Sequence, residues 1–108
     1  MEKSIFLEVV GDSSTMKVLQ YLIEGRDFDY TLTDIAENAG VSWGTLHTIF
    51  PRLIKRNIVI KTRDIGRAKL YKINIENQIA KKLIDLYDYI ILNALKKHQE
   101  KKVITAVA

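Results

Sequence analysis

Basic side chains are concentrated in one segment of this sequence. Residues 41–75 hold eight lysines or arginines against one acid, Asp64, which gives the segment a local charge of +7. Residues 1–40 hold three bases against eight acids, a local charge of −5, and the whole chain carries +4. Lysine and arginine neutralise phosphates, so a basic segment of this kind is typical of nucleic-acid binding. Residues 41–75 therefore have the charge needed to bind a polyanion.

The residue types that covalent or metal chemistry needs are scarce. The chain has no cysteine, which excludes disulfides, thiolate nucleophiles and cysteine-ligated zinc. Its only two histidines, His47 and His98, are far apart in the sequence, so we expect no metal site. There is also no glycine-rich phosphate loop. We expect neither an enzyme nor a bound cofactor.

One stretch of the basic segment has the pattern of a helix that can enter a DNA groove. Leu46, Ile49, Phe50 and Leu53 recur at spacings of three and four, which predicts a single buried helical face. The outer face then carries Trp43, Gly44, Thr45, His47, Thr48 and Arg52. Hydroxyl and imidazole groups can donate or accept at base edges in the major groove, and glycine allows the backbone to approach closely.

The other basic residues are better suited to phosphates than to bases. The predicted phosphate contacts are Arg52, Lys55 and Arg56 at the helix end, and Lys61, Arg63, Arg67 and Lys69 in the following strand pair. A loop with two arginines around Gly66 suits insertion into a minor groove. The alternative is a solvated hairpin whose charges only maintain solubility. Because this charge adjoins the predicted groove-binding helix, DNA is the favoured interpretation.

Two residues at the start of that helix have more than one interpretation. Ser42 is expected to cap the helix, a contribution of ~1 kcal/mol, and it can also donate to a phosphate. Trp43 can contact DNA through its ring or its N–H, or it can pack back on the preceding helix.

The elements that position these residues are expected to form one mainly α domain with a small β-hairpin, an α+β arrangement. Periodicity and capping residues predict helices over 13–24, 33–39, 42–56 and 78–99, and strands over 30–32, 58–62 and 70–75 with a loop at 63–68. Residues 3–10 can form a helix or an edge strand, and we favour a helix packed against the last one. The expected helix N-caps are Asp12 or Ser13, Thr33, Ser42 and Asn77. Asn57 is expected to adopt the left-handed conformation that closes a helix.

The last predicted helix is apolar over more of its surface than one small domain needs. Its apolar residues cover an arc of roughly 180°, whereas a stripe of ~100° is enough to cover a core. The expected interface residues are Ile79, Leu83, Ile84, Leu86, Tyr87, Ile90, Ile91, Ala94 and Leu95. A two-fold partner copy would bury the excess, and the alternative is that the N-terminal segment alone covers it. A homodimer would set two groove-binding helices ~34 Å apart on a roughly palindromic site.

A family resemblance supports this interpretation. Residues 32–47 read LTDIAENAGVSWGTLH and look like a helix-turn-helix, whose usual core is Ile-Ala-x-x-x-Gly-Val-Ser. Residues 53–59, LIKRNIV, are similar to the exit from such a motif into a wing. Residues 13–95 as a whole resemble winged helix-turn-helix regulators of the MarR/ArsR-like type, especially small archaeal ones. Two positions depart from the pattern: Asn57 replaces the common glycine, and Pro51 lies inside the recognition helix.

The resemblance implies a function and an organisation. The chain is expected to be a homodimeric, sequence-specific regulator that binds double-stranded DNA, with promoter occlusion as the default mechanism. The recognition helix would lie in the major groove and the wing on the minor groove or backbone. Residues 1–76 would form the DNA-binding domain, residues 77–100 the dimerisation helix and residues 101–108 a frayed tail. Pro51 is expected either to bend the recognition helix or merely to mark the end of its first half.

Other functions remain open at this point. The chain can instead be a winged-helix module that binds protein in a transcription or replication complex, or an architectural or plasmid-maintenance DNA-binding protein. No apolar stretch reaches the ~18–20 residues of a membrane span, and the first residues lack the layout of a signal peptide, so a cytoplasmic protein is expected. The sequence names no effector. Tyr21, Tyr87 and Tyr89 can line an effector pocket, although such tyrosines are more commonly packing residues.

Overall fold

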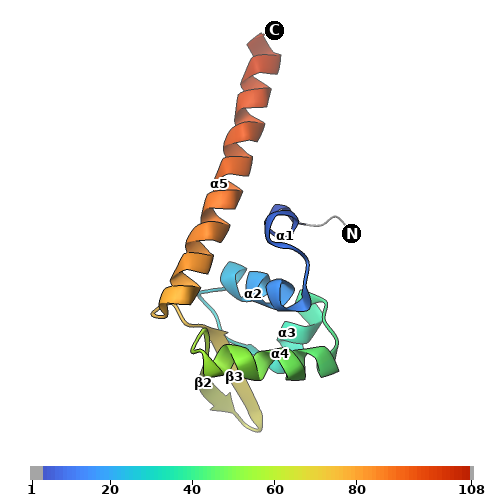
Figure 1. The fold of residues 1–108 in the computed structure, drawn as a ribbon, viewed down its shortest axis with the longest axis vertical. Coiled ribbons are helices and arrows are strands. Elements are labelled where there is room, and N and C mark those ends of the chain that lie inside the picture. The colour runs from blue at the N-terminus through green and yellow to red at the C-terminus, as the bar shows by residue number, and fades with distance from the viewer. Residues whose placement is uncertain (1–3, 108) are drawn as a thin grey trace.

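Five helices and a three-stranded sheet make up the described part of the chain. The computed structural model describes the backbone of residues 4–107 and the side chains of residues 4–97. In chain order the elements are α1 (Ile5–Val10), α2 (Ser14–Glu24), β1 (Tyr30–Thr31), α3 (Leu32–Ala39), α4 (Trp43–Lys55), β2 (Val59–Ile65), β3 (Ala68–Ile73) and α5 (Gln78–Val107). Figure 1 shows α2, α3 and α4 gathered beside the sheet, with α5 rising from it. The predicted fold, mainly helical with a small antiparallel sheet, is confirmed.

The core lies between α2, α3, α4 and the sheet. Val18, Leu22, Ile35 and Ile73 are fully buried there. The four apolar residues that define the predicted inner face of α4 are all buried as well: Leu46, Ile49, Phe50 and Leu53. Burial of that face fixes the rotation of α4, so its polar residues must point outward.

Side-chain caps and left-handed residues set most helix ends as predicted. The hydroxyls of Ser13 and Ser42 accept from the backbone N–H groups three residues later, and the amide oxygen of Asn77 accepts from Ala80 N–H. Gly40 and Asn57 adopt positive φ values of 70° and 58°, which lets the chain leave α3 and α4 by the tight turn that this conformation provides.

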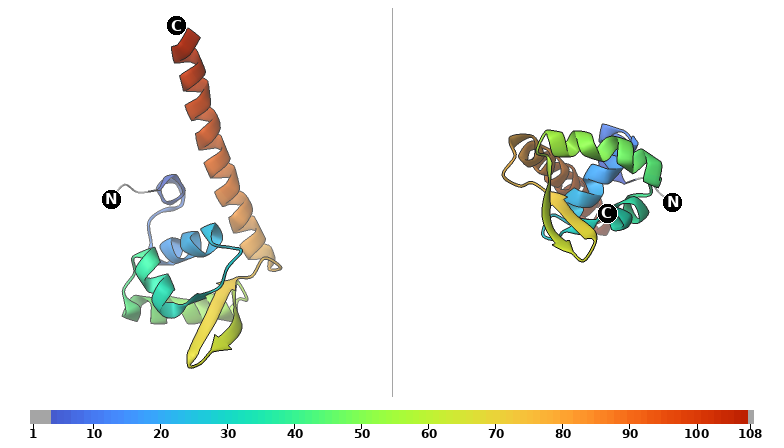
Figure 2. Two further views of the ribbon diagram at one scale, coloured as in Figure 1. Left: turned by 180° about the vertical axis from the view of Figure 1, so that it is seen from behind. Right: turned by 90° about the horizontal axis from the view of Figure 1, so that it is seen from below.

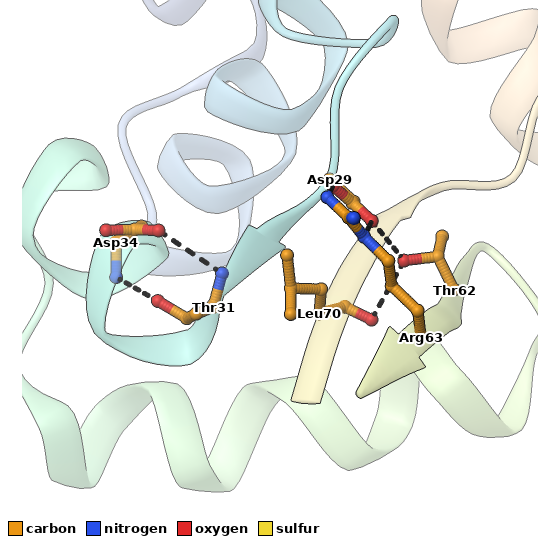
Figure 3. A network of polar contacts seen from close by, with 6 residues as sticks. All are labelled: Asp29, Thr31, Asp34, Thr62, Arg63 and Leu70. Carbon is orange, nitrogen blue, oxygen red and sulfur yellow. Dashed lines mark hydrogen bonds and ion pairs between the residues drawn. The ribbon is translucent and has the colours of Figure 1, made fainter. Parts of the chain in front are cut away.

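One predicted cap is wrong. Thr31, and not Thr33, caps α3: its hydroxyl accepts from Asp34 N–H, and the Asp34 carboxylate accepts in return from Thr31 N–H. This reciprocal capping box is drawn in Figure 3. The strand β1 ends at Thr31, so the helix begins at Leu32, which the sequence pattern had placed in the strand.

The sheet has the order β1-β3-β2 and is antiparallel throughout. The predicted loop at 63–68 is wrong, because β2 continues to Ile65 and β3 begins at Ala68, leaving a turn at Gly66 and Arg67. The strand ends are exposed, so they lack the alternation of buried and exposed residues from which strands are predicted. The pairing between β2 and β3 shifts register between Lys61 and Arg63, which marks a β-bulge at Thr62.

The helix α1 packs against the first half of α5. The favoured helical interpretation of residues 3–10 is confirmed from Ile5 onward, and α1 packs against α5 through the fully buried Phe6, whose ring meets Tyr87 edge-on at 5.3 Å. The helical backbone of α5 continues to Val107, so the predicted helix end near residue 99 was too early and most of the expected frayed tail is helical. Figures 1 and 2 show its C-terminal half extending away from the other elements. Among the described residues, no helix is long and apolar enough to span a membrane.

Pro51 does not interrupt the recognition helix. The helix α4 runs as one element from Trp43 to Lys55 with Pro51 inside it. Proline has no N–H, so the carbonyl of His47 loses its helical donor. Both residues are exposed, and water can satisfy that carbonyl.

Candidate nucleic-acid interface

The recognition helix and the hairpin lie at the same end of the molecule. Figures 1 and 2 show α4 and the β2–β3 hairpin at the end opposite the C-terminus of α5. The predicted basic segment therefore forms one continuous end of the protein. The predicted DNA contacts on α4 and on the hairpin are exposed, apart from the half-buried Thr45.

On the outer face of α4, Gly44 has no side chain and is surrounded by polar groups. No atom lies within 4 Å of the position that a Cβ of Gly44 would take, so this part of the helix backbone is open to a close neighbour. The Thr48 hydroxyl donates to the Gly44 carbonyl at 3.2 Å, and the Thr45 hydroxyl accepts from that of Ser42 at 2.8 Å. These bonds orient both hydroxyls and leave lone pairs on Thr48 for an outside donor.

Trp43 lies between the recognition helix and the hairpin. Its ring packs against the ring of His47 with centroids 4.5 Å apart, and it stays 50% exposed. It also lines an open pocket of about 240 Å³, together with Thr31, Leu32, Thr33, Arg67, Ala68, Lys69 and Tyr71. Trp43 thus borders the start of α3, as one interpretation expected, while half of its surface remains available to a ligand.

The four predicted basic residues of the hairpin differ in their surroundings. Lys61 forms an ion pair with Asp64, Nζ to Oδ2, at 2.7 Å. Arg63 is held by Asp29, with Nε and Nη2 at 2.9 and 3.1 Å from the two carboxylate oxygens. Among the described side chains, none forms an ion pair with Arg67 or Lys69. Those two side chains therefore remain available to a phosphate beside α4.

The contact with Arg63 also lowers the pKa of Asp29. Hydrogen bonds from Arg63 and then Thr62 lower the pKa of Asp29 to about 2. The same contact raises the pKa of Arg63. Asp29 was not recognised from the sequence, because it lies in an acidic loop more than thirty positions before its partners. Nothing in a single sequence signals that pairing.

The bases at the end of α4 complete the surface. Arg52, Lys55 and Arg56 are exposed, and within residues 4–97 no carboxylate pairs with their side chains. They continue the line of charge from the helix toward the start of the hairpin. The surface can bind a row of phosphates, and its polar centre can meet base edges.

The predicted interface residues on α5 separate into two groups. Ile84 belongs to the core of its own chain, Ile90 is also buried, and Tyr87 packs on Phe6. Leu83, Ile91 and Ala94 are half-buried, whereas Ile79, Leu86 and Leu95 are exposed by 40–56%. Tyr89 and Leu92 on α5 are also exposed, although they were not among the predicted interface residues.

A second open cavity, of about 510 Å³, lies on the other side of the molecule. It is lined by α1, α2 and the end of α3, including Tyr21, Lys17, Glu24 and Glu37. Of the tyrosines considered for an effector pocket, only Tyr21 borders it. Within the described residues, no group of three or more histidine, aspartate or glutamate side chains could hold a metal ion.

Known structures share this arrangement, although sequences do not. No family model matches the chain, and no curated protein matches it. The Staphylococcus aureus transcription regulator MepR superposes with a TM-score of 0.61 at 15% identity, covering 87% of this chain and 72% of MepR. Lactococcus lactis ZitR in complex with DNA gives 0.58 at 16%, covering 78% of this chain and 57% of ZitR. ZitR is a zinc-responsive MarR family member.

A shorter protein has a similar fold. Sso10a-2, a DNA-binding protein from Sulfolobus solfataricus, gives a TM-score of 0.52 at 13% identity over 82% of this chain and 93% of that one. The fold is a winged helix, similar to that of these regulators. In its terms α3 and α4 are the helix-turn-helix, α4 is the recognition helix, and β2 and β3 form the wing.

Proposed function

We propose that the chain binds double-stranded DNA in a sequence-specific manner and regulates transcription as a homodimer. The observation that carries the proposal is the position of the basic segment: its charge lies on the exposed face of α4 and on the wing, at one end of a winged helix. DNA binding by proteins of this fold, such as ZitR, supports it. Blocking a promoter is the simplest mechanism, because DNA binding alone is enough for it.

Each part of the surface has a distinct role in this proposal. Gly44, Thr45, His47 and Thr48 meet base edges in the major groove, while Trp43 and Ser42 contact the backbone beside them. The phosphate contacts are Arg52, Lys55, Arg56, Lys61, Arg67 and Lys69. Arg67 lies in the turn of the wing and suits a minor groove. No cofactor is needed for this binding.

The dimer rests on the length of α5. A helix segment without tertiary neighbours is only marginally stable in water, and the C-terminal half of α5 extends beyond the rest of the chain. Pairing with a second copy would bury Leu86 and Leu95, which are exposed by 40% and 56%. A dimer would also present two recognition helices to a roughly palindromic site.

Fluorescence anisotropy tests the proposal. The full chain is titrated onto labelled duplex DNA from upstream of its own gene and onto a scrambled duplex of equal length, across a salt series. We expect binding to the native duplex to be tighter by ~100-fold or more, with a steep loss of affinity as salt rises. Equal binding to both duplexes would favour an architectural protein. Absence of binding at low salt would favour a module that binds protein.

A further inference from the structure

One carboxylate, that of Asp29, holds the base of the wing. Asp29 precedes β1, and its side chain is only 17% exposed. It accepts two hydrogen bonds from Arg63, at 2.9 and 3.1 Å, and one from the Thr62 hydroxyl at 2.5 Å. Figure 3 shows all three groups converging between β1 and the wing. Asp29 therefore connects the segment before α3 to the second strand of the sheet.

The β-bulge makes this convergence possible. In a regular strand, consecutive side chains point to opposite faces. Here Lys61 pairs with Tyr71 and Arg63 pairs with Leu70, so Thr62 is the extra residue and it points the same way as Arg63. The ion pair between Lys61 and Asp64 shows that these two residues share the other face, which they could not do in a regular strand.

The bulge therefore separates Arg63 from the other wing cations. Asp64 pairs across the sheet with Lys69, so Lys61, Asp64 and Lys69 share one face. Lys69 on that face borders the pocket of Trp43, at the start of the recognition helix. Arg63 points to the opposite face, toward Asp29.

Leaving this contact for a phosphate would cost Arg63 a bidentate partner. A bidentate pair between guanidinium and carboxylate is among the stronger charge-assisted hydrogen bonds. If Arg63 left, the mostly buried Asp29 would keep the Thr62 hydroxyl as its only side-chain donor, and an unpaired buried carboxylate is costly.

We propose that Asp29 is a positioning residue of the wing: it locks the bulge at Thr62, sets the direction in which the hairpin projects, and withholds Arg63 from the DNA. The inference rests on the proposed DNA binding and sharpens it. The wing contacts DNA through Lys61, Arg67 and Lys69, while Arg63 belongs to the scaffold. Arg63, which the sequence suggests as a phosphate contact, thus contributes to specificity by fixing the direction of the hairpin.

Salt dependence separates the two roles. The full chain and the variants Arg63→Gln, Arg67→Gln, Asp29→Asn and Asp29→Asn/Arg63→Gln are titrated onto the native and scrambled duplexes across a salt series. A lost phosphate contact lowers the salt slope by about one. We expect this for Arg67→Gln and not for Arg63→Gln, which should instead lower the native-to-scrambled affinity ratio about tenfold, as one lost base contact does. Asp29→Asn should raise the slope by about one, because it releases Arg63, and the double variant should return it to that of the parent chain.

A variant that changes no charge tests the geometric role of Asp29 separately from its charge. Thr62→Val keeps every charge and removes one Asp29 contact, so it should lower the affinity ratio and leave the slope unchanged. Circular dichroism confirms that each variant is folded. Equal loss of slope in Arg63→Gln and Arg67→Gln would overturn the inference alone. Failure of the parent chain to bind either duplex would overturn the proposed function, and the inference with it.

Discussion

At the scale of single residues, Gly44 offers a test that separates stability from DNA binding. It lies inside α4, with no atom within 4 Å of the position that an alanine methyl group would take, so the chain itself does not require a glycine there. Gly44→Ala should therefore raise the free energy of unfolding by about 0.5–1 kcal/mol through helix propensity. The same methyl group would stand between the helix backbone and a DNA base. We expect weaker binding to the native duplex from a more stable protein.

The matched control for this change is Gly40. Gly40 has a φ of 70°, so Gly40→Ala should destabilise the protein by ~1 kcal/mol through backbone strain. Chemical denaturation and anisotropy measure the two effects separately. If Gly44→Ala bound DNA as tightly as the parent chain, close approach at this position would be excluded.

For single residues, the sequence predicted which side of a helix is buried more reliably than it predicted which side chains form ion pairs. The inner face of α4 follows from the spacing of Leu46 and its apolar neighbours, and burial of that face determines which polar residues point outward. The partner of Arg63 could not be predicted, since Asp29 is brought to it by the sheet and not by local spacing. Arg63 and Arg67 look equivalent in the sequence, and only the bulge distinguishes them.

At the scale of elements, the start of α3 can be tested by its cap. Thr31 and Asp34 form a capping box, whereas Thr33, the cap that the sequence indicated, lies inside the helix and is exposed. Thr31→Ala should lower the free energy of unfolding by ~1 kcal/mol, because it leaves helix N–H groups without an acceptor. Thr33→Ala should change it by only a few tenths. Equal losses in urea denaturation would contradict the observed cap.

Helices and sheet were not equally predictable. Helices were found because each buries one face against the core and so shows a 3.6-residue period. The first wing strand was predicted too short and the second was placed two residues too late, because residues 62–69 are exposed and carry no apolar period. The strand β1 ends at Thr31, one residue earlier than predicted. Its end is set by pairing with β3, where Thr31 lies opposite Leu70, and that contact joins residues far apart in the sequence.

At the scale of the whole molecule, Tyr87 links α5 to α1 and α2 in a way that depends on pH. Its hydroxyl donates to Glu24 at 3.0 Å, and its ring packs on Phe6. Burial, together with the bond to Glu24, raises the pKa of Tyr87 from 10.0 to about 12. The folded state thus holds this proton more tightly than the unfolded state. The contribution is complete below pH 10 and is lost as the pH rises through about 12.

Tyr87→Phe isolates this effect. The phenyl ring keeps the contact with Phe6 and lacks the ionisable hydroxyl. We expect the variant to be less stable than the parent chain at neutral pH, with the difference shrinking between pH 10 and 12. Thermal denaturation over that range measures it. A difference that stays constant across the range would show that Tyr87 does not titrate as the structure indicates.

The length of α5 makes the assembly of the whole molecule testable. Leu86 and Leu95 are exposed on α5, so Leu95→Lys should not disturb the core of a single chain. In a homodimer it would place a charge in an apolar interface, and buried charges without partners are strongly unfavourable. We expect the variant to sediment as a monomer. Gln78→Lys, an equal change of charge at an exposed position on the same helix, should sediment as the parent chain does.

Dissociation should also change DNA binding in a defined way. A dimer places two recognition helices on one palindromic site, so the second half-site binds within the same complex at high effective concentration. A monomer loses that advantage, and Leu95→Lys should bind a full palindrome only about as tightly as a half-site. The parent chain should prefer the full site by ~100-fold or more. If the parent chain itself sediments as a monomer and binds both sites equally, α5 has a role other than dimerisation, and the recognition helix and wing act alone.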